Sequence, residues 1–260
     1  MDIPRPTRTP LEISIGPGVT FPDWSAITSE AARRALAAIL AAFDAERCWT
    51  GMGEAEDRVR RAVLDGYADR GRAPSVEHLA ADLPLDEVRR LLRQLEGRDL
   101  VVLDAHGDVT GAYPFRDRET GHRVRLGGQV LNAMCAIDAL GAGAMYRTDT
   151  AIDSACATCG AAVHVTTRDR GATLEAVAPE GAVVWAGARN TGGCAADTLC
   201  PALAFFCSDE HLVSWRQSQP GGAPGVRLSI DEGLQVGKAI FAPLLAPLST
   251  LASNPRRTSR

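Results

Sequence analysis

Apolar residues recur at helical spacing over roughly the first hundred residues, and short alternating runs replace that pattern further along the chain. The spacing predicts four helices, followed by two strands that a turn centred on Gly107 joins into a hairpin. The first helix begins at a cap formed by Ser25 or by nearby Thr28 or Ser29. In chain order, the helices are expected over 25–47, about 54–68, 75–83 and 84–97, and the strands over 100–103 and 109–113.

Helix, short helix, helix and hairpin is the order of a winged helix-turn-helix, whose second helix enters DNA. The corresponding helix here has arginines on its polar side: Arg89, Arg90, Arg93 and Arg98. They are either DNA contacts or solvated side chains on a helical domain that packs against its neighbour. The low lysine content and the net charge of −4 favour the second interpretation, so no nucleic-acid partner is expected.

Beyond Tyr113 the chain alternates short β-branched runs with two helical stretches, one that begins at Ser208 and one predicted over 231–248. The fold class is therefore α+β, with a winged-helix-like helical domain followed by an α+β domain of short mixed or antiparallel strands. The predicted division is an irregular arm over 1–24, the helical domain over 25–113, the α+β domain over 114–250 and a flexible tail over 251–260.

The stretch Gly127–Leu140 combines an apolar helical pattern with two groups that can do chemistry. We expect a short helix entered from a turn at Gly127, which brings Cys135 and Asp138 onto one face. The helix dipole favours the thiolate, and the neighbouring carboxylate can exchange a proton with it. The alternative is that Cys135 is a small buried apolar residue, the usual role of a free cysteine.

Six of the seven cysteines lie between Cys135 and Cys207. In a reducing compartment they are expected as thiols or metal ligands rather than as disulfides. Cys156 and Cys159 form a CxxC pair, but a zinc site would need two further ligands, and no second CxxC or HxxxH is present. His211 is expected on a helix surface rather than as a ligand. Zinc binding, spare thiols and small buried residues all remain open for these cysteines.

No apolar run reaches the length of a membrane span. The first residues have neither the apolar core nor the cleavage site of a secretory signal. The chain is therefore expected to be cytoplasmic, without a membrane partner.

Three cysteine segments together resemble the alkylmercury (organomercurial) lyases. Met134-Cys-Ala-Ile-Asp-Ala-Leu resembles the WCALDTL segment of that family, and Ser154-Ala-Cys-Ala-Thr-Cys-Gly resembles the cysteine segment that follows it. Leu199-Cys-Pro-Ala-Leu-Ala-Phe-Phe resembles the family's second catalytic cysteine segment. The three segments occur in the family's order, and the resemblance extends over most of the chain after about residue 30.

The resemblance implies roles for individual residues. Cys135 and Cys200 match the two mercury-binding catalytic cysteines, and Asp138 matches the catalytic aspartate. Cys156 matches a cysteine usually treated as structural, whereas Cys159, Cys194 and Cys207 are additional to the pattern.

The implied activity is protonolysis of the carbon–mercury bond of alkyl and aryl mercury compounds, which yields a hydrocarbon and Hg(II). No cofactor is implied, but external thiols are needed for product release. Hg(II) would pass to small thiols or to a mercuric reductase. The competing hypothesis is a thiol-rich, metal-responsive winged-helix transcriptional regulator.

Overall fold

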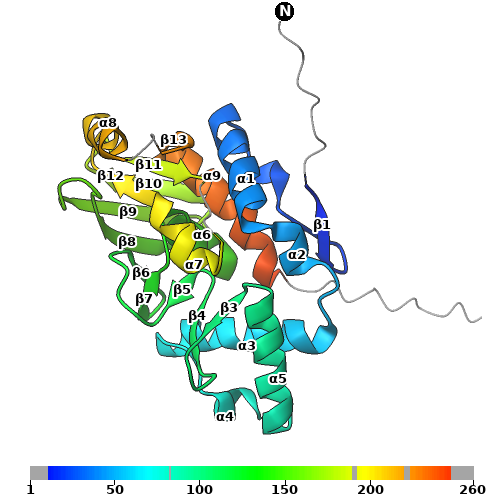
Figure 1. The fold of residues 1–260 in the computed structure, drawn as a ribbon. Helices are drawn as coiled ribbons and strands as arrows, with labels where there is room; N and C mark the ends of the chain where they lie inside the picture. The colour runs from blue at the N-terminus through cyan, green and yellow to red at the C-terminus, as the bar shows by residue number, and fades with distance from the viewer. Residues whose placement is uncertain (1–10, 82, 189–191, 220–222, 247–260) are drawn as a thin grey trace, which may run out of the picture.

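The computed structural model describes residues 11–81, 83–188, 192–219 and 223–246 (Figure 1). The tail predicted over 251–260 and residues 1–10 of the predicted arm lie outside these ranges. Within them helices and strands are mixed, which confirms the α+β class. None of the helices in the described ranges has both the length and the apolar character needed to cross a membrane.

Residues 11–24, predicted to be irregular, contain two paired strands, β1 (Ile13–Gly16) and β2 (Val19–Phe21). The short 3-10 turn Trp24–Ala26 follows them. Phe21 is buried, and its ring centroid lies 5.3 Å from that of Trp49. The prediction of an irregular arm is wrong for these residues, because the hairpin packs an apolar side chain against the helical domain predicted over 25–113.

The helices and the hairpin predicted within 25–113 are present in the predicted order. Their bounds are α1 (Glu30–Phe43), α2 (Ala45–Trp49), α3 (Glu54–Arg70), α4 (Val76–Leu79), α5 (Leu85–Gly97), β3 (Val101–Leu103) and β4 (Val109–Ala112). Ser29, one of the predicted caps, accepts from the N–H of Ala31 at 3.2 Å. The single helix predicted over 25–47 is broken at Asp44, whose φ of 52° is left-handed.

The apolar stripe of α5 is buried, as its helical spacing predicts: Val88, Leu91, Leu92 and Leu95. Arg98, at the end of this helix, is not a solvated side chain. Its guanidinium donates to Glu56 at 2.9 Å and to the carbonyl oxygens of Thr50 and Gly51 at 2.9 and 3.0 Å. Arg98 therefore joins α5 to the segment between α2 and α3.

One eight-stranded antiparallel sheet, in the order β10-β9-β8-β6-β7-β5-β4-β3, runs through the predicted domain boundary at residue 113. Its further strands are β5 (Phe115–Arg116), β6 (Arg123–Leu126), β7 (Gln129–Ala133), β8 (Thr150–Ala155), β9 (Ala162–Arg168) and β10 (Thr173–Ala178). Ala112 of β4 pairs with Phe115 of β5, so the boundary falls at a strand junction rather than at a gap. One buried apolar core also includes residues from both sides of it.

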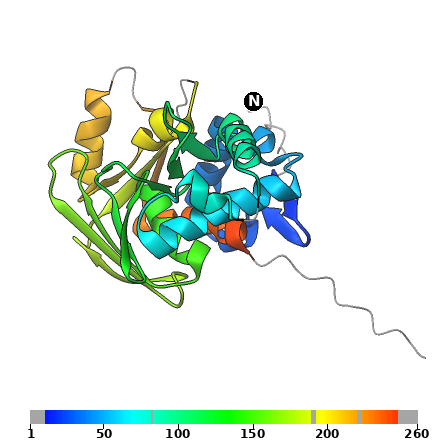
Figure 2. The same cartoon turned by 90° about the horizontal axis from the view of Figure 1, so that it is seen from below.

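A second, three-stranded sheet has the order β12-β11-β13. The elements of this part are β11 (Val183–Gly187), α7 (Ala195–Thr198), the 3-10 turn Cys200–Ala202, β12 (Leu203–Phe206), α8 (Asp209–Ser218), β13 (Gly225–Ser229), α9 (Ile230–Phe241) and the 3-10 turn Ala242–Leu245. Ser208 caps α8 as predicted. In Figures 1 and 2, α9 runs through the middle of the molecule, with the N-terminal helices on one side and the large sheet on the other.

The helix predicted over Gly127–Leu140 is wrong in its first half. Gln129–Ala133 is strand β7, which pairs with β6 on one side and with β5 on the other. Helix α6 begins at Ala136 and continues to Tyr146, beyond the predicted end at Leu140. The spacing of the apolar residues in this stretch fits a helix or a strand. The strand forms because, inside the sheet, its backbone N–H and C=O groups are hydrogen-bonded to a neighbouring strand on each side.

Helices α6 and α9 are in backbone contact at two glycines. A Cβ built on Gly141 would lie 2.7 Å from the carbonyl oxygen of Gly237, and one built on Gly237 would lie 2.7 Å from the Gly141 nitrogen. No side chain can enter such a gap without moving the helices. Because Gly141 and Gly237 have no side chain, they determine the distance between α6 and α9.

Gly237→Ala should destabilise the fold by about 1–3 kcal/mol, because the new methyl group meets backbone atoms of α6 that cannot rotate away. Gly97→Ala in α5 is the matched control, since no atom of the described residues lies within 4 Å of a Cβ built at that position. That change should be neutral or stabilise by up to about 1 kcal/mol. Urea unfolding of both variants measures the difference, and equal effects would contradict the close-contact argument.

Candidate functional site

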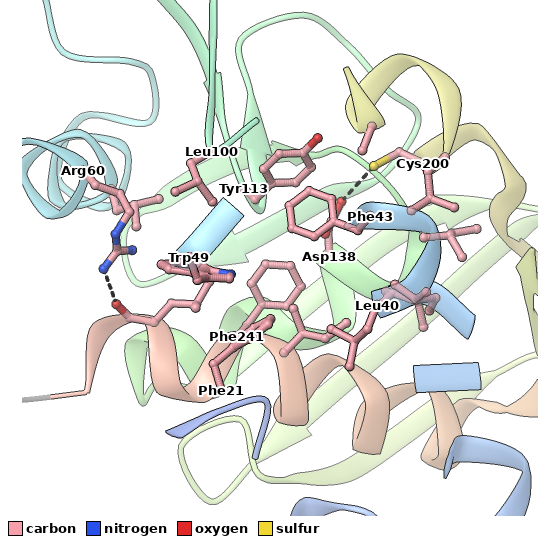
Figure 3. A pocket seen from close by; sticks show the side chains of 18 residues that line it. Phe21, Leu40, Phe43, Trp49, Arg60, Leu100, Tyr113, Asp138, Cys200 and Phe241 are labelled. Atoms are coloured by element: carbon pink, nitrogen blue, oxygen red, sulfur yellow. Dashed lines mark hydrogen bonds between the residues drawn. The ribbon is translucent and has the colours of Figure 1, made fainter. Parts of the chain in front are cut away.

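Cys135, Asp138 and Cys200 come together in the structure, although Cys200 lies far from the other two in sequence. Their two sulfurs and one carboxylate oxygen all lie within 4.8 Å of one another. The Cys200 thiol donates to Asp138 Oδ2 at 3.6 Å (Figure 3). All three residues are buried. The sequence prediction that these side chains are neighbours is consistent with this geometry.

The start of α6 holds the first two groups. Cys135 is the N-cap residue with an extended backbone, and its sulfur accepts a hydrogen bond from the N–H of Asp138 at 3.4 Å. The thiol therefore occupies the place of a capping oxygen and pairs one of the free N–H groups at the helix start. The two side chains are adjacent because of this cap and not, as predicted, because both lie on one helix face.

Cys200 belongs to the 3-10 turn between α7 and β12, and the helical unit fixes that segment. The Asp99 carboxylate, at the end of α5, accepts from the N–H of Ala195 at 2.9 Å and from the Tyr113 hydroxyl at 3.4 Å. Because Ala195 opens α7, this contact orients the short helix that leads to Cys200. The N-terminal unit thus helps to place the second sulfur.

Burial is the largest cause of the pKa shifts of Asp138 and Cys135. It raises the pKa of Asp138 to about 7 and the pKa of Cys135 to about 11. The hydrogen bond with Cys135, together with burial, holds the pKa of Cys200 well above its usual range. The helix start was expected to favour the thiolate of Cys135, but the loss of solvent outweighs that effect. In the absence of a metal, both thiols are protonated at neutral pH.

Asp138 and Cys200 border an apolar cavity of about 70 Å³ (Figure 3). This volume is several times the roughly 10–15 Å³ that one water needs. Its walls come from the N-terminal hairpin, α1, α2, α3 and α9, and include Phe21, Leu40, Phe43, Trp49 and Phe241. The cavity can hold a small apolar group beside a carboxyl and a thiol.

A second, open and more polar cavity of about 550 Å³ lies on another side of Cys200. His122, Met134 and Cys156 are among the residues that line it. His122 is half-buried, and burial lowers its pKa to about 4. Cys200 therefore borders one apolar and one polar space.

The remaining cysteines divide into two groups. Cys48 is buried in the helical unit, and Cys194 is the half-buried N-cap residue of α7. Cys156, Cys159 and Cys207 instead gather around His211. Hydrogen bonds from the N–H groups of Cys159 and Cys207, which outweigh burial, lower the pKa of Cys156 to about 6. His211 was predicted to lie on a helix surface rather than to be a ligand, but it lies among these cysteines. Its place four residues after Cys207, in the first turn of α8, was a usable signal.

The comparisons with known proteins agree with this arrangement. The family model for alkylmercury lyase matches residues 115–242, which include all three groups of the site. Over these residues the chain is similar to the alkylmercury lyases.

Several alkylmercury lyases are similar over most of the chain. The protein of Staphylococcus epidermidis is 29% identical over 185 residues, which cover 70% of this chain and 81% of that one. The proteins of Bacillus cereus and Clostridium butyricum are each 26% identical over 188 residues, covering 72% of this chain and 82% of theirs. The crystal structure of the mercury-bound form of MerB2 shares the fold, with a TM-score of 0.65 and 22% identity over 83% of this chain and 100% of that one.

The raised pKa of Asp138 predicts a pH-dependent stability. Between about pH 4 and pH 7 the folded chain keeps a proton on Asp138 that the unfolded chain releases, so rising pH favours unfolding. The free energy of unfolding of the wild type, relative to Asp138→Asn, should therefore fall by up to about 4 kcal/mol over this range and then level off. Urea titrations at several pH values measure it, and parallel curves for the two proteins would contradict it.

Proposed function

We propose that this chain is an organomercurial lyase, which breaks the carbon–mercury bond of alkyl and aryl mercury compounds by protonolysis. The products are a hydrocarbon and Hg(II). The observation that carries the proposal is the buried group of two thiols and one carboxyl, of which Cys200 and Asp138 line an apolar cavity. The similarity to the alkylmercury lyases supports the same reaction.

The thiols suit the metal. Thiolates are the softest ligands among protein side chains, and mercury is a soft ion, so Cys135 and Cys200 bind it in preference to imidazole or carboxylate. Metal binding requires deprotonated sulfur and therefore releases a proton from each thiol. Because both thiols are protonated at rest, their protons are available at the reacting centre.

The first step is capture of the substrate as a mercury thiolate, R–Hg–SR′. The Cys135 sulfur binds mercury, the bond to the external thiolate breaks, and the Cys135 proton leaves with R′SH. Cys200 then binds the same mercury through its sulfur and passes its proton to Asp138 Oδ2, the oxygen to which it already donates.

Asp138 completes the reaction as a general acid. The carboxyl gives its proton to the carbon, the electron pair of the carbon–mercury bond forms the new C–H bond, and RH leaves. The carboxylate is then ionised again, and Hg(II) stays on the two sulfurs. A pKa of about 7 allows Asp138 both to accept and to donate a proton near neutral pH.

The two cavities beside Cys200 divide the remaining tasks. The apolar cavity takes the organic group, and the open cavity gives external thiols access to mercury on Cys200. Two such thiols return their protons to Cys135 and Cys200 and remove Hg(II), for transfer to other small thiols or to a mercuric reductase. The reaction as written needs no cofactor.

The competing regulator hypothesis has less support in the structure. A recognition helix needs arginines that are free to reach DNA. Arg98 is engaged with Glu56 and neighbouring carbonyl oxygens, and Arg90 bonds to Glu87 and Gln94. We therefore propose the lyase activity and no DNA binding.

Asp138→Ala should lower hydrocarbon release from methylmercury by about 10²–10⁴-fold, because general-acid catalysis is lost. Mercury binding should remain, since both sulfurs are intact. Headspace gas chromatography with excess external thiol measures the methane, and equilibrium dialysis measures the bound mercury. Cys135→Ser and Cys200→Ser should each reduce both quantities.

Cys194→Ser is the matched thiol control for these variants. Serine is a favourable N-cap residue for α7, and Cys194 lies outside the group of three. Its turnover should stay close to that of the wild type. Full methane release by Asp138→Ala would rule out the proposed proton path, and wild-type binding without any turnover would rule out the lyase.

Phe43→Ala should change the preference among organic groups. Phe43 lines the apolar cavity and is half-buried, so its removal enlarges the space at limited cost in stability. The ratio of kcat/KM for phenylmercury to that for methylmercury should rise about tenfold, a typical effect of added room in an apolar pocket. Steady-state assays on both substrates measure the ratio, and an unchanged ratio would place the organic group elsewhere.

A further inference from the structure

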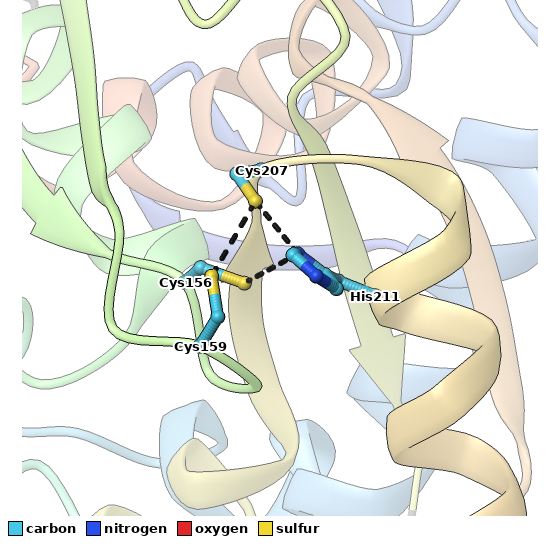
Figure 4. A group of neighbouring side chains, drawn as sticks. All are labelled: Cys156, Cys159, Cys207 and His211. Carbon is cyan, nitrogen blue, oxygen red and sulfur yellow. Dashed lines mark hydrogen bonds between the residues drawn. The ribbon is translucent and has the colours of Figure 1, made fainter.

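Four metal-ligating side chains form a second cluster, apart from the three groups of the proposed reaction. One ligand atom from each of Cys156, Cys159, Cys207 and His211 lies within 4.8 Å of all the others (Figure 4). The two cysteines of the CxxC pair come from the turn between β8 and β9, and the other two ligands from the start of α8. The cluster thus joins two segments that are remote in sequence.

We propose that these four side chains hold a resident Zn²⁺ in a Cys₃His site. Three thiolates and one imidazole form a usual ligand set for structural zinc, which is tetrahedral and leaves no position open. The spacing also suits it, since the CxxC pair and the Cys207–His211 pair, four residues apart, each bring two ligands from one short segment.

Two distances between the ligand atoms agree with a tetrahedron, and a third is shorter. With Zn–S near 2.3 Å and Zn–N near 2.0–2.1 Å, neighbouring sulfurs lie roughly 3.8 Å apart, and sulfur and nitrogen roughly 3.6 Å apart. The sulfurs of Cys159 and Cys207 are 3.7 Å apart, and Cys156 Sγ is 3.8 Å from His211 Nδ1. The distance from Cys207 Sγ to His211 Nδ1 is 2.8 Å. This pair must therefore move apart by roughly 0.8 Å to bind the ion.

Surrounding hydrogen bonds hold the ligands in place. The N–H of Ala161 donates to Cys159 Sγ at 3.5 Å, which stabilises the thiolate form that binds metal. The Thr158 hydroxyl donates to the carbonyl oxygen of His211 at 2.8 Å and so connects the two ligand segments directly. Gly160, with a φ of +72°, gives the CxxC turn its left-handed residue. Such outer contacts orient the ligands of a metal site.

The position of the cluster at the end of strand β12 indicates a structural role for the ion. Cys200 opens the 3-10 turn Cys200–Ala202 that leads directly into strand β12, and Cys207 follows the last residue of that strand. The N–H of Ala157, within the CxxC pair, donates to the carbonyl oxygen of Phe205 in this strand at 3.0 Å. Zinc therefore fixes the C-terminal end of β12, the strand whose N-terminal end positions Cys200. The ion has a structural role and takes no part in the reaction itself.

The zinc content of the full-length protein tests the proposal. The chain is produced with added zinc and without mercury, then gel-filtered and analysed by plasma mass spectrometry, with an expected content of about one zinc per chain. Cys159→Ser and His211→Asn should each lower it at least fivefold. Cys194→Ser and His164→Asn, which remove one thiol and one imidazole elsewhere, should keep it.

Two further measurements make the result independent of whether a variant folds. A strong chelator applied to the wild type should lower Tm by at least about 5 °C, and added Zn²⁺ should restore it. Cobalt in place of zinc should give the intense visible bands of tetrahedral thiolate coordination, and these bands should be lost in Cys159→Ser and kept in Cys194→Ser.

Three outcomes would overturn the proposal. The first is a wild-type zinc content below about a tenth of an ion per chain after growth with zinc. The second is a Cys159–Cys207 disulfide under reducing purification, which would make the group a redox pair. The third is uptake of a second mercury, but not zinc, that Cys159→Ser abolishes, which would make the cluster a mercury acceptor. The first and second outcomes leave the lyase proposal unaffected, because its own test is hydrocarbon release.

Discussion

The backbone contact between α6 and α9 is the constraint on which the site depends. Gly141 and Gly237 let the two helices approach until each one's backbone meets the other's. Because α9 also packs against α1, the direction of α6 is fixed by both halves of the chain. Cys135 and Asp138 lie at the N-terminus of α6, so the distance between the two helices determines the position of these two groups of the proposed reaction.

A comparison of two free energies, that of the helix dipole and that of burial, explains why the groups of the site are protonated rather than ionised. A helix N-terminus stabilises a negative charge by about 0.3–1 kcal/mol at an exposed position and by up to about 2 kcal/mol in partly buried geometries. Burial raises the pKa of Asp138 from 3.8 to about 7, which corresponds to about 4 kcal/mol against its charge. Burial therefore outweighs the dipole at the same helix start. Thiols in this state release their protons only when a soft cation binds the sulfurs, which is the step at which the proposed protonolysis uses a proton.

The parts of the fold that local pattern determines could be predicted from the sequence. The stripe of α5 and the caps at Ser29 and Ser208 depend on residues within a few positions of one another. Strand β7 could not be predicted, because its apolar residues also fit a helix and its pairing with β5 and β6 decides between them. The proximity of Cys200 to Cys135 was inferred from the family resemblance, because the local spacing of residues cannot predict a contact between positions that are 65 residues apart.

The cluster around His211 was hidden for the same reason, and its presence raises a question of selectivity. Mercury prefers thiolates wherever they occur, so affinity alone does not separate Cys135 and Cys200 from a cluster of three further cysteines. Access and charge do separate them. Cys135 and Cys200, the thiols of the proposed reaction, are buried, and Cys200 lines an apolar cavity that favours an uncharged organomercury compound, whereas Cys159 is exposed. An ion already bound by four ligands must leave before mercury can enter the second cluster, so a resident zinc would also protect these thiols from the product of the reaction.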